Sequence, residues 1–368
     1  MADPMDPAPQ RVEDLEAAAR DRLPAPIWDY LSGGSGTEAT LTSNRAVLDA
    51  YELLPRVLVD VSATDPGCTL LGRELALPVG IAPMAYHRLL HPEGEVATAR
   101  AAGVAGALLV VSIFASRTVE EIAAAATGPL WLQLYWLHRR EELATLMRRA
   151  EDSGFEALVL TVDTPRVAVR LRDRRSGFTL PGDVRAVNVS PSVMAASHAH
   201  AGDTSAIERH SAQQFDPSLA WPDLAWIRAR TGLPLVLKGI LTAADAELAV
   251  EHGVEAIVVS NHGGRQLDGA VPSIRALPEI AAAVRGRCQV LVDGGIRRGA
   301  DVFKALALGA DAVLIGRPAL WGLTAAGADG VAAVLRMLGD ELREVMMLAG
   351  RPSVANVGPE AVREVPLS

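Results

Sequence analysis

Eight short apolar runs, separated by helical patterns, restrict the possible folds of this chain more than any other feature. Helical apolar spacing lies between most of the runs, for example over Val96–Ala105, Val119–Ala126, Arg140–Ser153, Ala243–His252 and Ala300–Leu308. The runs, which we expect to be strands, are Val79–Pro83, Ala107–Ser112, Leu130–Tyr135, Ala157–Asp163, Pro234–Lys238, Ala256–Ser260, Gln289–Asp293 and Ala312–Gly316. Eight alternating strand–helix units close into a parallel barrel, so the sequence predicts an α/β protein with a (β/α)8 TIM barrel.

The chain before the first run predicts an N-terminal helical extension. Helical spacing over Val12–Leu23 ends at Pro24, and a short helix is expected over Ile27–Leu31. Residues 34–39 resemble a dinucleotide-binding fingerprint, but that motif needs a preceding strand, and Trp28–Leu31 is a poor strand. Residues 1–10 have no apolar core, so we expect a loose tail and no signal or membrane span. We expect residues 1–72 to form a helical segment and linker on the barrel, which takes residues 73–368.

One connection is far longer than the others. After the fourth run, the chain continues to about residue 223 without sustained periodicity, and insertions of that length are usually functional or mobile. We therefore expect a lid over the site at about residues 171–222. The insertion contains His198 and His200, but no third ligand is spaced to join them, so we predict no metal site.

Composition narrows the class of partner. The formal net charge of −9 argues against nucleic-acid binding, which needs a basic surface. The two cysteines, Cys68 and Cys288, are far apart and lack metal-like spacing, which fits a reducing cytoplasm without disulfides. We expect a cytoplasmic protein that binds a small molecule and no membrane.

The stretch Ser260–Asp268 breaks abruptly from the apolar run before it. It places a histidine, two glycines and an arginine directly after the sixth predicted strand. Loops after the strands form the reactive face of a barrel, so His262 and Arg265 are placed to act as a base beside a carboxylate anchor. The alternative is a polar turn in which both side chains are solvated.

The loops after the last two predicted strands indicate a phosphate site. Gly294, Gly295 and Gly316 let backbone N–H groups approach an anion, and Arg297 and Arg317 supply charge. Barrels commonly bind phosphate at this position. The alternative is a pair of tight turns before helices.

Lys238, one of two lysines in the chain, ends the fifth predicted strand after a run that reads as fully buried. A lone buried ammonium is costly, so Lys238 is expected to face an anion in the barrel mouth. The alternative is a lysine that extends to the surface.

These residues resemble the FMN-dependent 2-hydroxy-acid oxidases and dehydrogenases, a family that includes glycolate oxidase, lactate oxidase and mandelate dehydrogenase. The resemblance covers nearly the whole chain, from Trp28 through Ser260–Asp268 to Pro318, in the family's order and spacing. The stretches that look most like 4-hydroxymandelate oxidases are Pro83–Tyr86, Gln133–Leu137 and Leu237–Leu241. The resemblance implies an FMN cofactor and a homo-oligomer, often a tetramer.

The resemblance also implies a catalytic group. His262 would take the substrate's proton, while Asp163 would hold its tautomer and stabilise the imidazolium. Tyr135 would hydrogen-bond the substrate hydroxyl or the developing carbonyl, and Lys238 would stabilise the reduced flavin. Arg265 would complete the group by binding the substrate carboxylate.

Substrate binding would also involve Arg170 and Tyr30 at the carboxylate. The family commonly has Gly-Arg-Arg where this chain has Ala168–Arg170, so only Arg170 matches. Tyr30 stands where the hydroxymandelate oxidases tend to have phenylalanine. Phe114 replaces a tryptophan of glycolate oxidase, which would enlarge the pocket and favour an aryl substrate.

The residues implied to hold FMN come from seven strand ends. Those beside the ring would be Pro83, Met84, Ala85, Ser112, Gln133, Thr161 and Lys238, and those at the ribityl phosphate would be Asp293, Gly294, Gly295, Arg297, Gly316 and Arg317.

The function implied is oxidation of an (S)-2-hydroxy acid, mandelate or 4-hydroxymandelate, to the 2-keto acid, with O2 as acceptor and H2O2 as second product. The alternatives are an aliphatic substrate such as lactate or glycolate, or another electron acceptor. A further alternative is an FMN barrel of the nucleotide-dehydrogenase or isomerase kind, whose chemistry often needs a loop cysteine. Another alternative is a flavin-binding protein without turnover, which would not need His262, Asp163 and Arg265 together.

Overall fold

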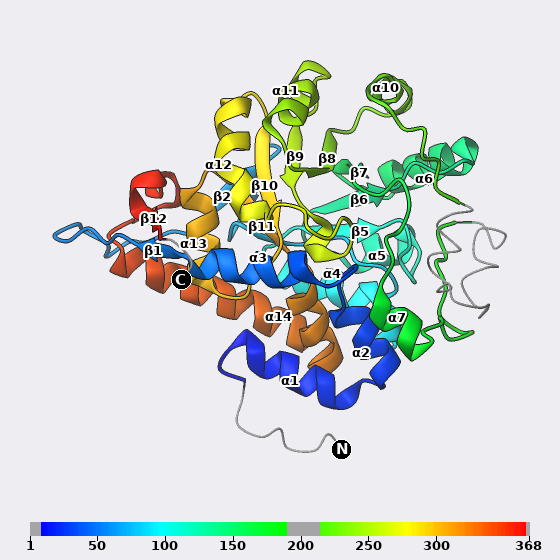
Figure 1. The fold of residues 1–368 in the computed structure, drawn as a ribbon, viewed down its shortest axis with the longest axis horizontal. Helices are drawn as coiled ribbons and strands as arrows, with labels where there is room; N and C mark the ends of the chain where they lie inside the picture. Colours follow the sequence, from blue (N-terminus) through cyan, green and yellow to red (C-terminus); the bar gives the residue numbers. More distant parts are fainter. Residues whose placement is uncertain (1–8, 190–213, 366–368) are drawn as a thin grey trace.

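A computed structural model describes residues 9–189 and 214–365, and it contains the predicted barrel (Figure 1). Its eight parallel strands close in the order β10-β11-β4-β5-β6-β7-β8-β9, so neighbours in sequence are neighbours in space. The strands are β4 (Val79–Ile81), β5 (Leu109–Ser112), β6 (Leu130–Leu134), β7 (Ala157–Thr161), β8 (Leu235–Ile240), β9 (Ala256–Val259), β10 (Gln289–Asp293) and β11 (Ala312–Ile315). Each coincides with a predicted strand.

Helices surround the barrel and form the extension. Those that the sequence predicted are α1 (Val12–Arg22), α2 (Ala25–Ser32), α4 (Glu95–Val104), α5 (Val119–Ala125), α6 (Arg140–Asp152), α11 (Ala243–Glu251) and α13 (Gly299–Ala307). Those beyond the predictions are α3 (Ala39–Asp49), α7 (Leu171–Ser176), α10 (Leu224–Arg228), α12 (Ser273–Val284) and α14 (Arg317–Leu348). Because α2 precedes residues 34–39, the strand that a dinucleotide fingerprint requires is not there.

Two apolar layers follow from strand periodicity. Alternate residues such as Val110, Val159 and Val258 pack inside the barrel, while Val111, Leu160 and Val259 pack against the helices. A hairpin of β2 (Cys68–Leu70) and β3 (Arg73–Leu75) packs its leucines against the inner layer. The strand β1 (Tyr51–Leu53) pairs with β12 (Val362–Glu364) near the C-terminus.

The long helix α14 runs along one side of the barrel and contacts α1, α4 and α13 (Figure 1). Non-helical backbone at Ala326 and Gly327 divides it in two. Among the described residues, α14 alone has the length and composition of a membrane span, and 72% of its apolar window is buried inside the fold. That burial is typical of a core helix.

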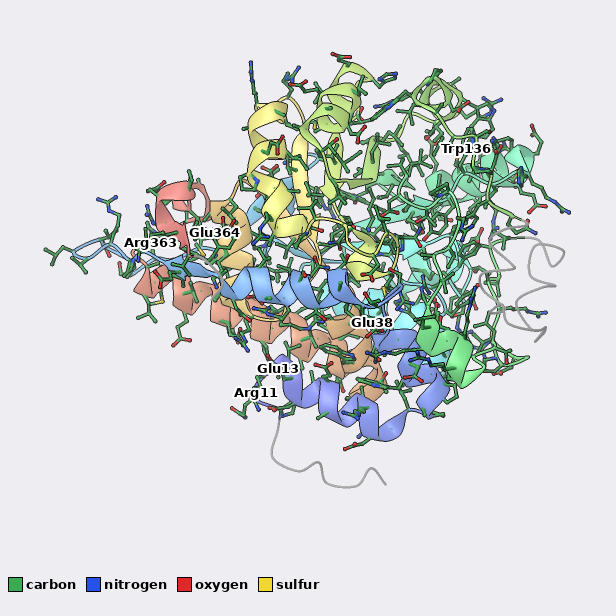
Figure 2. The ribbon with its side chains drawn as sticks, in the orientation of Figure 1. Arg11, Glu13, Glu38, Trp136, Arg363 and Glu364 are labelled. Atoms are coloured by element: carbon green, nitrogen blue, oxygen red, sulfur yellow. The ribbon has the colours of Figure 1, made fainter. Side chains whose placement is uncertain are left out.

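The predicted lid falls partly within the described residues. Its first part contains α7, which contacts α2, and Arg172 of α7 pairs with Glu38, which Figure 2 labels. Its last part returns through residues 214–222 to a short 3-10 helix, Trp221–Asp223, ahead of α10. His198 and His200 lie outside the described residues, and the division of the chain at residues 72 and 73 stays a prediction.

Candidate active site

A cavity of about 1140 Å³, counting the open solvent at its mouth, lies at the carboxyl ends of the barrel strands. Strand periodicity explains its polar floor, because the residue two positions after a buried inner residue also faces inward. Val236 is followed in this way by Lys238, Val258 by Ser260 and so on around the barrel. The inward polar residues are Ser112, Gln133, Thr161, Lys238, Ser260 and Asp293.

His262 and Asp163 form a hydrogen-bonded pair beside the cavity. Nδ1 of His262 lies 2.9 Å from Oδ1 of Asp163, which also accepts a 2.8 Å hydrogen bond from the Thr164 hydroxyl. Burial raises the pKa of Asp163, but the charge and hydrogen bond of His262, with Lys238 and Thr164, hold it below its ordinary value. Asp163 therefore stays ionised, fixes the ring and can stabilise an imidazolium.

Unusual backbone conformations position this pair. His262 has a φ of 59°, in the left-handed region that non-glycine residues rarely adopt. Gly239, with a φ of 113°, passes so close to Asp163 that an added Cβ would lie 2.6 Å from the Asp163 Cβ. The sequence therefore needs glycine at position 239 to admit the carboxylate behind the histidine.

Arg265 and Arg170 bring positive charge to the same side of the cavity. Nη1 of Arg265 donates to the carbonyls of Tyr30 at 2.9 Å and Gly33 at 2.7 Å, at the end of α2. Burial and the neighbouring Arg170 lower the pKa of Arg265 to about 10, so it remains charged at neutral pH. Nε of Arg170 is buried and has no hydrogen-bond partner among the described residues. These groups and the Tyr30 phenol, whose pKa burial raises, suit a small carboxylate.

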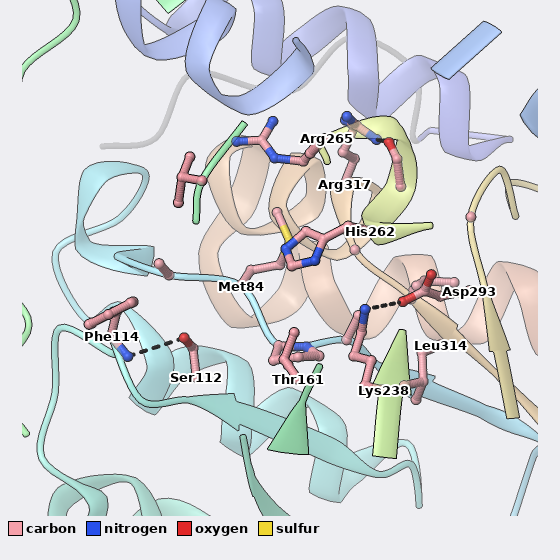
Figure 3. A pocket seen from close by; sticks show the side chains of 18 of the residues that line it. Met84, Ser112, Phe114, Thr161, Lys238, His262, Arg265, Asp293, Leu314 and Arg317 are labelled. Carbon is pink, nitrogen blue, oxygen red and sulfur yellow. Dashed lines mark hydrogen bonds and ion pairs between the residues drawn. The ribbon is translucent and has the colours of Figure 1, made fainter. Parts of the chain in front are cut away.

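Lys238 is 4% exposed and already faces an anion within the protein. Its Nζ lies 2.9 Å from Oδ2 of Asp293 and donates to the Ser260 hydroxyl at 2.8 Å. Ser260 in turn donates to Oδ1 of Asp293 at 2.6 Å and accepts from the backbone N–H of His262 at 3.0 Å. In Figure 3, Lys238 lies below His262, on the side opposite Arg265 and Arg317. The surface-lysine alternative is wrong, because β8 buries this side chain.

A row of polar groups crosses the ends of β5, β6 and β7. Gln133 Oε1 accepts from the Ser112 hydroxyl at 3.2 Å, and Gln133 Nε2 donates to the Thr161 hydroxyl at 3.0 Å. Ser112 and Thr161 line the cavity, whereas Gln133 lies behind them and is 1% exposed. The hydroxyls of Ser112 and Thr161, which Gln133 orients from behind, can donate to or accept from a polar ring edge.

The two glycine-arginine loops lie side by side, as β10 pairs with β11. Arg297 and Arg317 both line the cavity, and burial lowers the pKa of each. Arg265, Arg297 and Arg170 lower the pKa of Arg317 further by repulsion, so an anion among these groups would be stabilised. The N-terminus of α14 at Gly316 has no side-chain cap. Pro318 carries no N–H and the N–H of Ala319 donates to the Gly316 carbonyl at 3.1 Å, so the backbone N–H groups of Gly316 and Arg317 are the ones placed to meet an anion.

Helix α3 fixes both sets of loops. Asn44 and Asn261 exchange side-chain hydrogen bonds of 2.9 and 2.7 Å, which holds the histidine loop. Arg45 donates to the Gly295 carbonyl at 2.9 Å and to the buried Asp301, whose carboxylate accepts from the backbone N–H of Arg297. One helix thus orients the loop of the base and the loop expected to bind phosphate.

Aromatic rings form one wall of the cavity. Phe114 stacks on Tyr135 with ring centres 5.6 Å apart and on Tyr86 at 6.4 Å. Phe215, from the end of the long insertion, stacks on Tyr135 at 4.5 Å and on Phe114 at 5.9 Å. This wall favours a ligand with an apolar, planar part.

The structure brings the predicted site residues together. Most of them line the one cavity, while Asp163 and Gln133 stand directly behind its lining. Sequence reasoning missed Ser260, which strand parity would have found, and Phe215, for which the aperiodic insertion gave no signal. The described residues contain no group of three or more metal-ligating side chains. The site roles themselves stay predictions.

Comparison with known proteins identifies the family. A family profile described as FMN-dependent dehydrogenase matches residues 19–364. The chain belongs to this family. The chain is 53% identical to a 4-hydroxymandelate oxidase of Amycolatopsis orientalis over 93% of this chain and 94% of that protein. It is also 47% identical to an L-lactate oxidase of Nostoc sp. over 93% and 95% of the two chains.

A solved structure agrees with this assignment. The crystal structure of a mandelate oxidase with (S)-4-hydroxymandelic acid superimposes with a TM-score of 0.93 and 50% identity, covering 96% of this chain and 98% of that chain. The predicted family, fold, enzyme class and FMN cofactor are confirmed. Glycolate oxidase of Spinacia oleracea is a further relative, at 44% identity over 94% of this chain and 93% of that protein.

The cavity of this family member fits FMN. Arg297 and Arg317 would hold the phosphate together with the backbone N–H groups of Gly316 and Arg317, because they combine charge with hydrogen-bond donors. Ser112 and Thr161, backed by Gln133, would hydrogen-bond the ring, and Lys238 would lie near it. No described residue of this donor set conflicts with an anionic, planar cofactor.

Proposed function

We propose that this enzyme oxidises (S)-mandelate or (S)-4-hydroxymandelate to the 2-keto acid and reduces O2 to H2O2. Oxidation of the 2-hydroxy acid releases two electrons and two protons, and reduction of O2 to H2O2 consumes the same number of each. The observation that carries the proposal is one cavity lined by His262, which Asp163 holds from behind, and by Arg265, beside the glycine-arginine loops. The names of the relatives, 4-hydroxymandelate oxidase and mandelate oxidase, support the substrate class.

The chain's own residues account for binding and proton transfer. Arg265, with Arg170 and the Tyr30 phenol, binds the carboxylate and fixes the substrate's orientation. His262 takes a proton at Nε2, since Nδ1 is committed to Asp163. Bound FMN supplies the two-electron acceptor.

Tyr135 orients the reacting oxygen. Burial raises the pKa of its phenol, so the hydroxyl remains a donor at neutral pH and can bond the substrate's oxygen. Its ring also belongs to the aromatic wall, so one residue touches both the polar and the apolar ends of the substrate.

A substrate panel under air tests this proposal. We expect kcat/KM to rank 4-hydroxymandelate and mandelate above lactate and glycolate, because only the aryl acids meet the aromatic wall. Keto acid and H2O2 should appear in equal amounts. A higher kcat/KM for lactate or glycolate would favour the aliphatic alternative, and keto acid formed only with an added artificial acceptor would contradict the use of O2.

A nucleotide-dehydrogenase or isomerase function has less support. Neither cysteine lines the cavity, and burial raises the pKa of Cys68 to about 12 and of Cys288 to about 11, so neither is a ready nucleophile. Cytoplasmic location and assembly into a homo-oligomer, a tetramer by family resemblance, remain proposals that fractionation and light scattering would test.

A further inference from the structure

Phe215 occupies a distinctive place in the cavity. It lies at the return of the long insertion, is 3% exposed and lines the same cavity as His262 and Arg265. Its ring stacks on Tyr135 at 4.5 Å with an interplanar angle of 25° and on Phe114 at 5.9 Å with an interplanar angle of 9°. A residue remote in sequence from the barrel strands thus completes the aromatic wall.

Backbone pairing holds Phe215 in this place. The N–H of His138 donates to the Gln214 carbonyl at 2.9 Å, and the N–H of Asp216 donates to the Trp136 carbonyl at 2.8 Å. An antiparallel bridge joins Leu137 to Phe215 between these bonds. The segment around Phe215 is therefore tied to the chain that leaves β6, directly after Tyr135.

An ion pair reinforces the attachment. Arg140 Nη2 lies 2.5 Å from Oδ2 of Asp216, and its guanidinium stacks 3.6 Å above the ring of Trp136, which Figure 2 labels. Cation–π stacking and the ion pair act on the same guanidinium, so they fix it in one orientation. Backbone hydrogen bonds and this ion pair therefore position Phe215 in the aromatic wall from the residues on either side of it.

We propose that Phe215 is a specificity-determining residue that selects aryl over short aliphatic 2-hydroxy acids. The inference rests on the proposed function and deepens it. His262, Arg265 and the hydroxyl of Tyr135 contact the part that all 2-hydroxy acids share, so these polar groups cannot distinguish aryl from alkyl groups. A phenyl group beyond that shared part meets Phe215 and Phe114, whereas the methyl group of lactate is too short to gain the same contact.

The test compares substrates within each variant. For Phe215→Leu, we expect the ratio of kcat/KM for mandelate over lactate to fall by about tenfold, because an aromatic contact is lost and the aliphatic substrate never made it. Phe215→Tyr keeps the ring and should hold the ratio near that of the parent enzyme. An unchanged ratio in Phe215→Leu would overturn the proposal.

Phe178→Leu is the matched control. Phe178 belongs to the same insertion, is equally buried and stacks on Tyr30 at 4.5 Å, but it does not line the cavity. We expect its loss to affect both substrates alike and to leave the ratio unchanged. A fall as large as in Phe215→Leu would mean that any ring of the insertion matters, which contradicts a specific role for Phe215.

A binding measurement covers variants too slow to assay. The dissociation constants of benzoylformate and pyruvate, measured from changes in the flavin spectrum, should show weaker aryl binding in Phe215→Leu and unchanged pyruvate binding. Equal weakening of both ligands would overturn the proposal. Failure of the proposed function looks different, because it would appear in the parent enzyme itself, either as no oxidation of mandelate or as a higher kcat/KM for lactate than for mandelate.

Discussion

His262, the proposed base, is held in an uncommon backbone conformation. His262 has a φ of 59°, and its ring reaches Asp163, which follows β7, two strands away from β9 in the barrel. Residues held in such conformations cluster at functional sites, where the surrounding fold compensates the strain. The geometry therefore assigns one ring nitrogen to Asp163 and leaves the other for the substrate.

His262→Asn tests this assignment. Asparagine tolerates the left-handed conformation, so FMN should remain bound, while the rate of flavin reduction by mandelate should fall by about 10²- to 10⁴-fold for want of a base. Anaerobic stopped-flow mixing measures the rate, and the flavin content of the purified variant is the control. Reduction at the parent rate would remove His262 from the mechanism.

At this scale, the sequence predicted the polar residues that end a strand and failed for residues defined by tertiary contact. Lys238 and Asp293 could be predicted because strand position alone turns them inward. Their mutual ion pair could not, since it joins β8 to β10. The position of Phe215 could not be predicted from the sequence, because it depends on a backbone bridge to a residue about 80 positions earlier, and no local pattern encodes such a pairing.

Among the elements, α3 does the most to assemble the site, although no sequence pattern singled it out. It contacts the histidine loop through Asn44 and the glycine-arginine loop through Arg45. Its start is bound by Asp268, which accepts from the backbone N–H groups of Thr37 at 2.7 Å and Thr40 at 3.0 Å. The barrel strands could be predicted from their apolar pattern alone. The role of α3 could not, because it depends on contacts with residues more than 200 positions away.

Asp268 should make the stability of this contact depend on pH. Hydrogen bonds from the Thr40 backbone and the Thr37 side chain lower its pKa from 3.8 to about 2. A lowered carboxyl pKa stabilises the fold above the ordinary value and loses that effect as the pH falls from 3.8 towards 2. Asp268→Asn should reduce the free energy of unfolding at neutral pH by about 1 kcal/mol and flatten this acid dependence.

Thermal unfolding followed by circular dichroism from neutral to acidic pH measures the effect. Asp340→Asn is the control, because this carboxylate is exposed on α14 and makes no hydrogen bond or ion pair with any described residue. The control should keep the parent's acid dependence. An Asp268→Asn profile that follows the parent at every pH would show that this carboxylate does not hold α3.

At the scale of the whole molecule, the closed parallel barrel explains why residues far apart in the sequence form one site. Residues from Pro83 to Arg317 meet in one cavity because every strand points its carboxyl end the same way. Because the strand ends meet, most of the cavity lining could be predicted from the positions of the strands in the sequence. The additions outside the repeat, α14 and the long insertion, follow no period of the barrel, so their packing could not be derived in the same way.

The most direct test of this account is anaerobic mixing of the FMN-loaded enzyme with (S)-mandelate. If the cavity holds FMN beside His262 and Arg265, the absorbance of the oxidised flavin should disappear with (S)-mandelate and persist with (R)-mandelate. Flavin that stays oxidised with (S)-mandelate, 4-hydroxymandelate, lactate and glycolate alike would contradict the account.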